Sequence, residues 1–346
     1  MKTLFILIFG VSLSSTSLAQ DIHFTMFHAA PTALNPACAG VFDGTFRAST
    51  NFKTQWGTVS NAYNTFSLTA DGSFFKNKGG TAHLGIGLNM YRDVAGATKF
   101  GTTKMDLSLS AIIFLDEKNT GSVGLSGGWG QRTISPENLQ WDSQYEDGTG
   151  YNGMLPSNES LSFENSNYFD FSAGVLWNHG TAASNIASFD KFRSQVGFAY
   201  HHIARPKINN YTLEEKKYSK FVIHADLHFS QENSRMAFRP RISAFFQGPS
   251  RELNIGMMFR YLIKEGSKFT GNVKGFAISA GAYYRVADAI SPSIEIELAG
   301  FSLGYSYDFN TSGLRAASNG LGGHEIYLKF QNPNPFFRFS RRPSIR

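Results

Sequence analysis

Apolar and polar residues alternate along most of the chain, and this feature limits most strongly what the sequence can form. The clearest stretch is residues 301–309, where every second residue is apolar and those between are Ser, Gly or Asp. Residues 169–178 and 221–230 repeat the pattern, with aromatic residues near the ends of the apolar set. Because successive side chains of a β-strand point to opposite faces, each stretch predicts a strand with one apolar and one polar face.

Strand length distinguishes the two kinds of sheet protein that alternate in this way. A soluble sandwich turns its apolar face inward, and its strands average about five or six residues. The stretches here run for about ten residues, which matches a tilted strand that crosses a bilayer. We therefore predict an all-β fold, a transmembrane outer-membrane β-barrel of about 14 antiparallel strands, with twelve or sixteen strands as open alternatives. The predicted strands are 44–56, 61–75, 80–91, 99–116, 121–132, 168–179, 191–204, 219–231, 236–248, 251–263, 273–285, 290–298, 300–309 and 322–331.

Composition agrees with a barrel and excludes several other classes of protein. Aromatic residues make up 14% of the 346 residues and glycine occurs 34 times. Only 17% of the residues are charged, against about 25% in typical soluble domains. The single cysteine excludes a disulfide scaffold and any multi-cysteine metal site. The formal net charge of +6 is spread along the chain, so it gives no support to nucleic-acid binding.

The two ends of the chain lie outside the strand pattern. Residues 1–19 start with a basic residue, continue with an apolar run at 4–13 and end in Ser-Leu-Ala, which predicts a secretory signal peptide cleaved after Ala19. We expect residues 20–43 to form an N-terminal periplasmic or plug segment. Residues 44–331 would then form the barrel, and 332–346 a basic periplasmic tail.

The connection between the predicted strands at residues 133–167 is the first candidate for a binding surface. If the first strand runs outward from a periplasmic N-terminus, this connection lies outside the cell. It carries Trp141, Tyr145 and Tyr151 among acidic residues, a composition typical of protein-binding surfaces. The alternative is that these side chains pack on one another and cap the barrel mouth. The connection 310–323, which contains Leu314 and Asn319, lies on the same side in this topology.

The sequence His224-x-Asp226-x-His228 is the candidate for metal chemistry. Residues two apart on a strand share a face, so these three side chains should point into the barrel. Two imidazoles and a carboxylate suit zinc or iron, but they suit equally an interior hydrogen-bonded cluster with Arg239 or Arg241 on the next strand. We find no nucleotide, metalloprotease or serine-hydrolase motif, and therefore expect neither an enzyme nor a cofactor.

Charged residues of both signs fall on the predicted inner face of the barrel. Mixed signs indicate ion pairs that cross-link the inner wall, because a selectivity field would carry one sign. We therefore predict a plugged or narrow interior. The predicted inner charges are Arg47, Lys53, Asp71, Asp106, Asp170, Arg260, Arg285, Glu295, Glu297, Asp308 and Glu325.

Blocks near both ends of the chain carry a more specific pattern. The first has an acidic residue with an aromatic neighbour and continues as Leu-Asn-Pro-Ala-Cys-Ala-Gly at 34–40. The pair Gln55-Trp56 follows, and the last block contains Ser-Tyr-Asp-Phe-Asn at 306–310. In these blocks and in their order the sequence resembles the PorP/SprF family of outer-membrane proteins of the type IX secretion system. The motif residues are Asn35, Pro36, Gly40, Gln55, Trp56, Asp308 and Asn310.

This resemblance implies a non-catalytic outer-membrane barrel, in contact with outer-membrane lipid, that works in protein secretion. It implies one of two roles. One is to join periplasmic ring or lipoprotein components of the secretion machine. The other is to deliver or retain a secreted adhesin, including adhesins of gliding motility, through its C-terminal sorting domain at the two long loops. A passive channel or transporter for a small solute is the alternative, and a soluble secreted β-sandwich is a third possibility.

Overall fold

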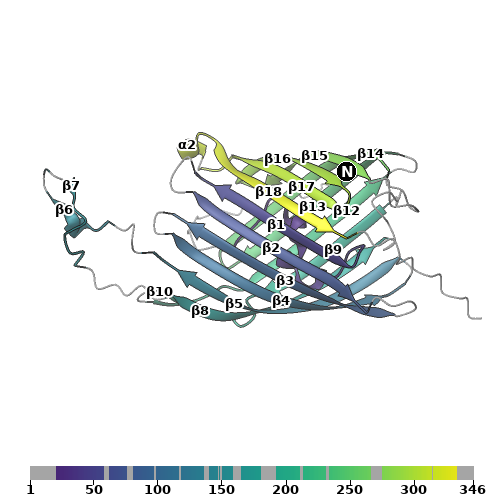
Figure 1. Ribbon diagram of the computed structural model, residues 1–346, viewed down its shortest axis with the longest axis horizontal. Coiled ribbons are helices and arrows are strands. Elements are labelled where there is room, and N and C mark those ends of the chain that lie inside the picture. Colours follow the sequence, from purple (N-terminus) through teal and green to yellow (C-terminus); the bar gives the residue numbers. More distant parts are fainter. Residues whose placement is uncertain are drawn as a thin grey trace, which may run out of the picture.

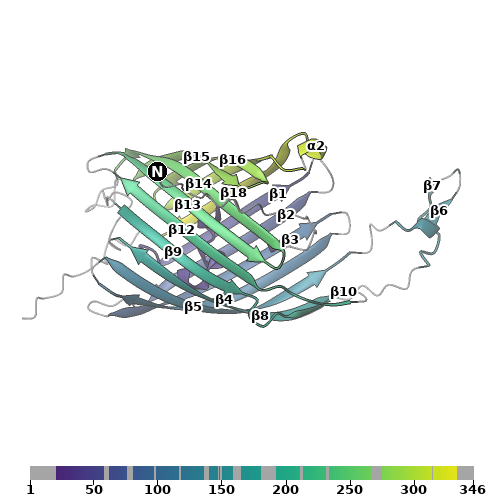
Figure 2. The same cartoon turned by 180° about the vertical axis from the view of Figure 1, so that it is seen from behind.

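The alternating stretches pair edge to edge and close on themselves. The computed structural model of the protein describes residues 21–57, 62–75, 81–96, 99–116, 118–135, 140–146, 148, 150–158, 165–180, 192–210, 213–230, 234–265, 275–313 and 315–332. Within these residues fourteen antiparallel strands form the wall of a closed barrel, in which the first strand pairs with the last (Figures 1 and 2). Closure satisfies the backbone N–H and C=O groups that lipid cannot. The wall strands are β1 (Phe46–Gln55), β2 (Tyr63–Phe74), β3 (Ala82–Ala95), β4 (Phe100–Phe114), β5 (Asn119–Thr133), β8 (Ser166–His179), β9 (Phe192–His201), β12 (Lys220–Ser230), β13 (Met236–Gln247), β14 (Ser250–Lys264), β15 (Phe276–Arg285), β16 (Ala289–Leu298), β17 (Phe301–Asn310) and β18 (Leu321–Gln331).

Each of the fourteen predicted segments overlaps one wall strand, so the predicted barrel and its strand number are confirmed. The sequence did not predict two small hairpins outside the wall, because their strands are too short to show an alternation. These are β6 (Tyr145–Glu146) with β7 (Gly150–Tyr151), and β10 (Lys207–Asn210) with β11 (Leu213–Lys216). The helices in the described part of the chain are short, and none of them is long and apolar enough to span a membrane.

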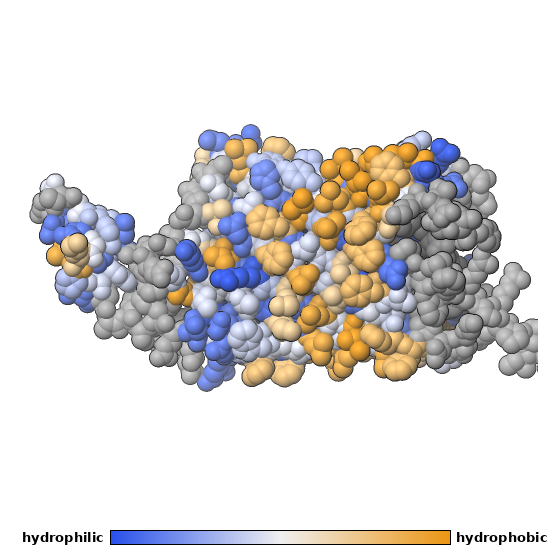
Figure 3. Space-filling view, viewed as in Figure 1, coloured by the Kyte–Doolittle hydropathy of each residue, from blue (hydrophilic) through white to orange (hydrophobic). Residues whose placement is uncertain are grey.

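The apolar face of each wall strand points outward and the polar face points inward. Phe171 and Leu303 are about half exposed on the outside, whereas their neighbours Ser172 and Ser302 are buried inside. Figure 3 shows hydrophobic residues gathered over the wall, with hydrophilic residues toward the ends of the barrel. In an outer-membrane barrel the bilayer covers such an apolar band.

The two ends of the barrel differ, and we name them by what they carry. At the terminal rim β1 begins beside the end of β18, where the Asn332 N–H donates to the Phe46 carbonyl at 2.9 Å. This rim also carries the turn between β4 and β5. There the Asp116 carboxylate accepts the Lys118 and Asn119 N–H groups at 2.7 Å. The Asn119 side-chain amide and these two N–H groups lower the pKa of Asp116 below its usual value.

The opposite end, the loop rim, carries the connections that the sequence analysis expects outside the cell. Helix α2 (Arg315–Ser318) lies at this rim, between β17 and β18. The β6–β7 hairpin also lies on this side and stands clear of the wall in both views (Figures 1 and 2). The predicted long loop and the 310–323 connection are therefore on the same end of the barrel.

Candidate functional site

Residues 21–43 lie inside the barrel, and we call this segment the plug (Figure 1). It folds into three short turns, and prolines occupy the first positions of the second and third, where a missing N–H costs nothing. Most of its side chains from residue 24 to residue 40 are buried. The turns are η1 (Phe27–Ala29), α1 (Pro31–Leu34) and η2 (Pro36–Cys38).

The plug runs from near the loop rim to the terminal rim. At its start, Asp21 forms ion pairs with His202, which follows β9, and with Lys217, at 2.7 Å for the lysine. At its end, the Asp43 carbonyl accepts a hydrogen bond from the Gln331 side chain at 2.5 Å. Both ends of the segment are thus fastened to the wall.

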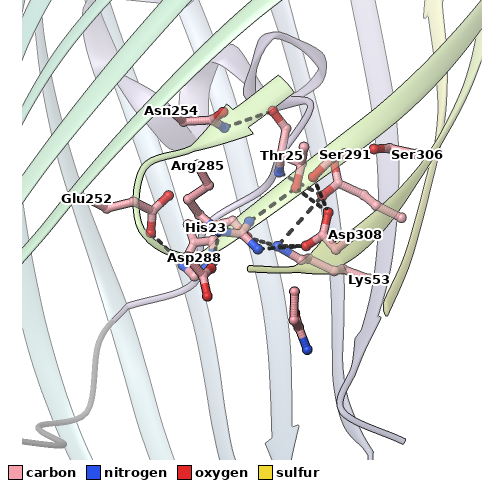
Figure 4. A network of polar contacts seen from close by, with 12 residues as sticks. His23, Thr25, Lys53, Glu252, Asn254, Arg285, Asp288, Ser291, Ser306 and Asp308 are labelled. Carbon is pink, nitrogen blue, oxygen red and sulfur yellow. Dashed lines mark hydrogen bonds and ion pairs between the residues drawn. The ribbon is translucent and has the colours of Figure 1, made fainter. Parts of the chain in front are cut away.

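The first part of the plug is held by buried charges of β14 to β18 (Figure 4). The Glu325 carboxylate accepts the Thr25 and Met26 N–H groups, both at 2.7 Å. The Thr25 hydroxyl donates to Asp308 at 3.2 Å, and the Thr25 carbonyl accepts from Asn254 at 3.1 Å. Hydrogen bonds to charged groups are about twice as strong as neutral ones, so these contacts fix the backbone here.

Arg285 links this network to the loop rim. Its guanidinium donates to Asp308 at 2.7 Å and to the Thr25 hydroxyl at 3.3 Å, and it also pairs with Asp288 in the turn after β15 (Figure 4). The Asp288 carbonyl accepts the N–H groups of Thr311 and Ser312, which begin the loop before α2. A continuous set of contacts therefore joins this loop to the plug.

Asn35 fastens the middle of the plug to the opposite side of the wall. Its side-chain amide donates to the carbonyls of Val175 at 3.0 Å and Phe198 at 3.3 Å, and its oxygen accepts the Ala37 N–H at 2.9 Å. The same amide nitrogen lies 3.1 Å from the ring nitrogen Nε2 of His224. Asn35 is fully buried, so these bonds satisfy an amide that would otherwise be costly to bury.

Glycines on the inner face make room for the plug backbone. A Cβ atom at Gly85 would lie closer than 3.0 Å to the Ala39 carbonyl, and one at Gly124 would be equally close to Pro36 and Ala37. Neighbouring serines bond to the same stretch: Ser110 donates to the Ala39 carbonyl at 2.6 Å and Ser122 to the Ala37 carbonyl at 2.8 Å. The wall beside η2 is thus shaped to the plug.

Gly40 ends the close contact between plug and wall. Its φ of 71° is in the left-handed region that favours glycine. Its N–H donates to Asp71 at 2.8 Å, and its carbonyl accepts from Ser73 at 2.7 Å. Arg47 donates to both oxygens of Asp71, at 2.9 and 2.7 Å, which holds this carboxylate in place.

His224, Asp226 and His228 all face the lumen, but each has a different neighbour. His224 lies against Asn35, Asp226 accepts from Arg241 at 3.0 Å, and the ring of His228 accepts from Arg239 at 3.3 Å. These arginine contacts are the interior cluster that the sequence analysis considered. Among the described residues, no three His, Cys, Asp or Glu side chains are arranged to hold a metal ion.

All the charged residues assigned to the inner face by sequence lie there and take part in ion pairs. Arg260, for example, pairs with Glu297 at 2.7 Å, and Asp170 pairs with Lys104 at 2.7 Å. The sequence did not identify the uncharged inner residues that bond the plug backbone, such as Ser49, Ser110 and Asn254. Their only signal is a small polar residue on the inner face, which most strands share.

The remaining predicted residues lie at the loop rim. Gln55 is the last residue of β1, and the next residue, Trp56, packs edge-on against Tyr63 with ring centroids 4.8 Å apart. Asn310 donates to Ser318 at 3.0 Å and to the Leu321 carbonyl at 3.1 Å, and so ties down the α2 loop that includes Asn319. Leu314 lies outside the described residues, as do 1–20 and 333–346, which hold the predicted signal peptide and most of the predicted basic tail.

Tyr145 and Tyr151 face each other in the β6–β7 hairpin, and Trp141 lies in the turn just before it. The rings of Tyr145 and Tyr151 lie 5.6 Å apart, and these two side chains are 53% and 42% exposed. The buried Gln144 amide donates to the Leu155 carbonyl at 2.9 Å and braces the turn beneath them. The two tyrosine rings therefore pack on each other and stay partly exposed.

Cys38 provides a test of whether the plug is seated. The thiol is free and its side chain is 1% exposed, between the plug and the wall. We expect the folded protein in detergent to resist a thiol-reactive maleimide, and to react fully after denaturation, because reaction needs an accessible thiolate. Mass spectrometry of the labelled protein measures this, and rapid labelling of the folded barrel would contradict a seated plug.

Comparison with known proteins identifies the family. A family model described as type IX secretion system membrane protein PorP/SprF matches residues 16–330. The chain belongs to this family. The PorP/SprF assignment and the closed barrel make it an outer-membrane protein of the type IX secretion system. No curated protein matches the chain.

Several solved structures are similar to this PorP/SprF barrel in outline. The CymD monoaromatic hydrocarbon channel is 9% identical with a TM-score of 0.45, covering 88% of this chain and 94% of its own. A Pseudomonas aeruginosa FadL homologue is 11% identical with a TM-score of 0.44, covering 85% and 91%. The translocator domain of the autotransporter NalP from Neisseria meningitidis is 12% identical with a TM-score of 0.40, covering 88% and 92%.

Proposed function

We propose that this PorP/SprF barrel is a non-catalytic anchor that retains or delivers a secreted surface protein at the outer membrane. The observation that supports this best is the occupied lumen, which the plug follows from near one rim to the other and to which it is bonded on several sides. A barrel filled in this way acts on its cargo from its rims. Its sequence carries no nucleotide, metalloprotease or serine-hydrolase motif, which fits a binding role.

The loop rim is the proposed surface for the exported partner, an adhesin or its C-terminal sorting domain. The β6–β7 hairpin holds exposed aromatic rings clear of the wall, and Met154 beside them is 96% exposed. Aromatic and methionine side chains are enriched at protein interfaces. In this proposal the loop rim faces outward and the terminal rim faces the periplasm, where ring or lipoprotein components of the machine are met.

Removing the hairpin tests the proposal. A variant in which residues 137–164 are replaced by a short Gly-Ser linker should assemble normally, because the hairpin contributes nothing to the wall pairing. Surface biotinylation should then show loss of a secreted protein that wild-type cells retain. A triple variant, Trp141→Ala with Tyr145→Ala and Tyr151→Ala, should weaken retention at least about tenfold, since aromatic hot spots contribute about 2 kcal/mol or more each.

The control removes an exposed aromatic ring from the other end of the barrel. Phe75 is 72% exposed and follows β2 at the terminal rim, so Phe75→Ala should leave retention unchanged. Heat-modified migration on gels monitors barrel assembly in every variant. Normal display of surface proteins by the correctly assembled hairpin deletion would refute the proposed role of this loop.

A further inference from the structure

A cavity of about 310 Å³ lies between the plug and the terminal rim, and we call it the terminal vestibule. Plug residues from Phe27 to Asp43 line one side of it, and the inner faces of several wall strands line the other. Gly180 and Gln331, which lie at the ends of wall strands, mark its opening at the rim. This volume is at the lower end of the range of about 300–1,000 Å³ for small-molecule sites.

Positive side chains predominate in the lining of the terminal vestibule. Five basic residues reach it, against two carboxylates, Asp43 and Asp226. The basic residues are Arg47, Arg193, Arg239, Arg241 and Lys329. A concave site lined mainly by one sign of charge concentrates ions of the opposite sign.

Some of these basic groups retain hydrogen-bond donors after their contacts with the wall. Arg239 uses Nε toward His228 and Nη1 toward Glu297, and Arg241 uses Nε toward Asp226 and Nη1 toward the Tyr283 hydroxyl. A guanidinium carries five N–H donors. Within the described residues, the Nη2 groups of Arg239 and Arg241 have no hydrogen-bond partner. Both guanidinium groups can therefore still donate N–H groups to a ligand.

Lys329 adds a charge without a carboxylate partner. It lies on β18 opposite Ser49 and Ser302 and shares the inner face. Its ammonium lies 5.8 Å from the centre of the Tyr327 ring, and no carboxylate of the described residues is within ion-pair distance, since Glu295 and Glu297 act on it from beyond 4 Å. An ammonium in a cavity with no carboxylate in direct contact is a favourable position for an anion.

We infer that the terminal vestibule binds a small molecule bearing at least two oxyanion groups, such as a dicarboxylate, a tricarboxylate or a phosphate ester. Carboxylate and phosphate oxygens accept paired N–H donors from arginine, and the ammonium of Lys329 supplies a further charge-assisted bond. The cavity is sized for a metabolite, which favours a small ligand over a protein segment. This site is independent of the loop-rim function proposed above.

Titration of the full-length, detergent-solubilised protein tests the site, with citrate and inorganic phosphate as probes. Isothermal calorimetry should show saturable binding with one site per barrel for at least one of them, weakening as sodium chloride is raised. Lys329→Gln should weaken binding roughly tenfold, the equivalent of losing one charged hydrogen bond. The side chain makes no ion pair with the described residues, so this change should leave barrel assembly intact.

The matched control is Lys118→Gln, at the same rim but on an exposed turn outside the cavity, and it should leave binding unchanged. Three results would overturn the inference. These are no saturable binding of either probe, equal binding in wild type and Lys329→Gln, or equal weakening by the Lys118 control. Binding of an acidic hexapeptide without binding of either small probe would also overturn it, because the ligand would then be a protein segment.

Discussion

Replacing Gly85 and Gly124 by valine should displace the plug from a barrel that still closes. A Cβ at either position would lie closer than 3.0 Å to the plug backbone, which cannot move aside as a flexible side chain can. Overpacking costs about 1–3 kcal/mol at each site. The two changes together should therefore raise the population of displaced plug at least about tenfold, while the pairing of β3 and β5 with their neighbours stays unchanged.

Cys38 labelling and ion conductance in planar bilayers measure this displacement. The wild type should protect Cys38 and pass little current, whereas the double variant should label at least about tenfold faster and conduct. Gly121→Val is the matched control on β5, because a Cβ there meets only the Leu115 side chain at 3.7 Å. A double variant with protected Cys38 and wild-type conductance would show that the lumen tolerates these side chains, and would contradict the close fit of plug and wall.

The wall was predictable because its information is local. A strand that crosses the bilayer must alternate apolar and polar residues. A stretch such as 301–309 therefore shows, without its neighbours, how long the strand is and which side chains point to lipid. The same alternation predicted that the side chains of Asp308 and Glu325 point into the lumen. The alternation could not show that both carboxylates hold Thr25, which lies 283 residues before Asp308 and 300 before Glu325 in the chain.

The plug was only partly predictable, for a related reason. Residues 20–43 lack the alternation, which marked them as outside the wall but left a periplasmic or a lumenal position open. Gly124 and Gly85 meet the plug backbone, but in a sequence a missing side chain does not reveal what fills its place. The β6–β7 hairpin was missed because its two-residue strands show no period.

The motif that carried the family resemblance acquires a physical meaning from these contacts. Asn35 and Gly40 bond the plug to the wall, Asp308 receives its first part, and Asn310 ties down the adjoining loop. These contacts hold the plug in the lumen, and they do not form a binding surface for a particular cargo. The choice of partner is therefore expected to depend on loop-rim residues outside the motif, such as those of the β6–β7 hairpin.

Replacing Asp308 by leucine should lower the free energy of unfolding by about 3–5 kcal/mol, as expected for removing one partner of a buried ion pair. Asp308 is 2% exposed. It accepts from Arg285 at 2.7 Å and from Ser291 at 2.6 Å, and Lys53 lies 3.9 Å away. Its loss leaves Arg285 with only the partly exposed Asp288 as a carboxylate partner, and leaves Lys53 with only Glu325. Urea unfolding in detergent micelles, followed by circular dichroism, measures the change.

A second substitution separates the effect of the unpaired charge from that of a lost side chain. Arg285→Met in the Asp308→Leu background removes the charge that has lost its buried partner, and a buried pair replaced by apolar residues is often close to neutral. The double variant should therefore be more stable than Asp308→Leu alone. Asp142→Leu, on the exposed turn just before β6, should change the free energy of unfolding by less than about 0.5 kcal/mol. A double variant less stable than Asp308→Leu would contradict the explanation by an unpaired charge, and would show that Arg285 contributes mainly through its links to Asp288 and Thr25.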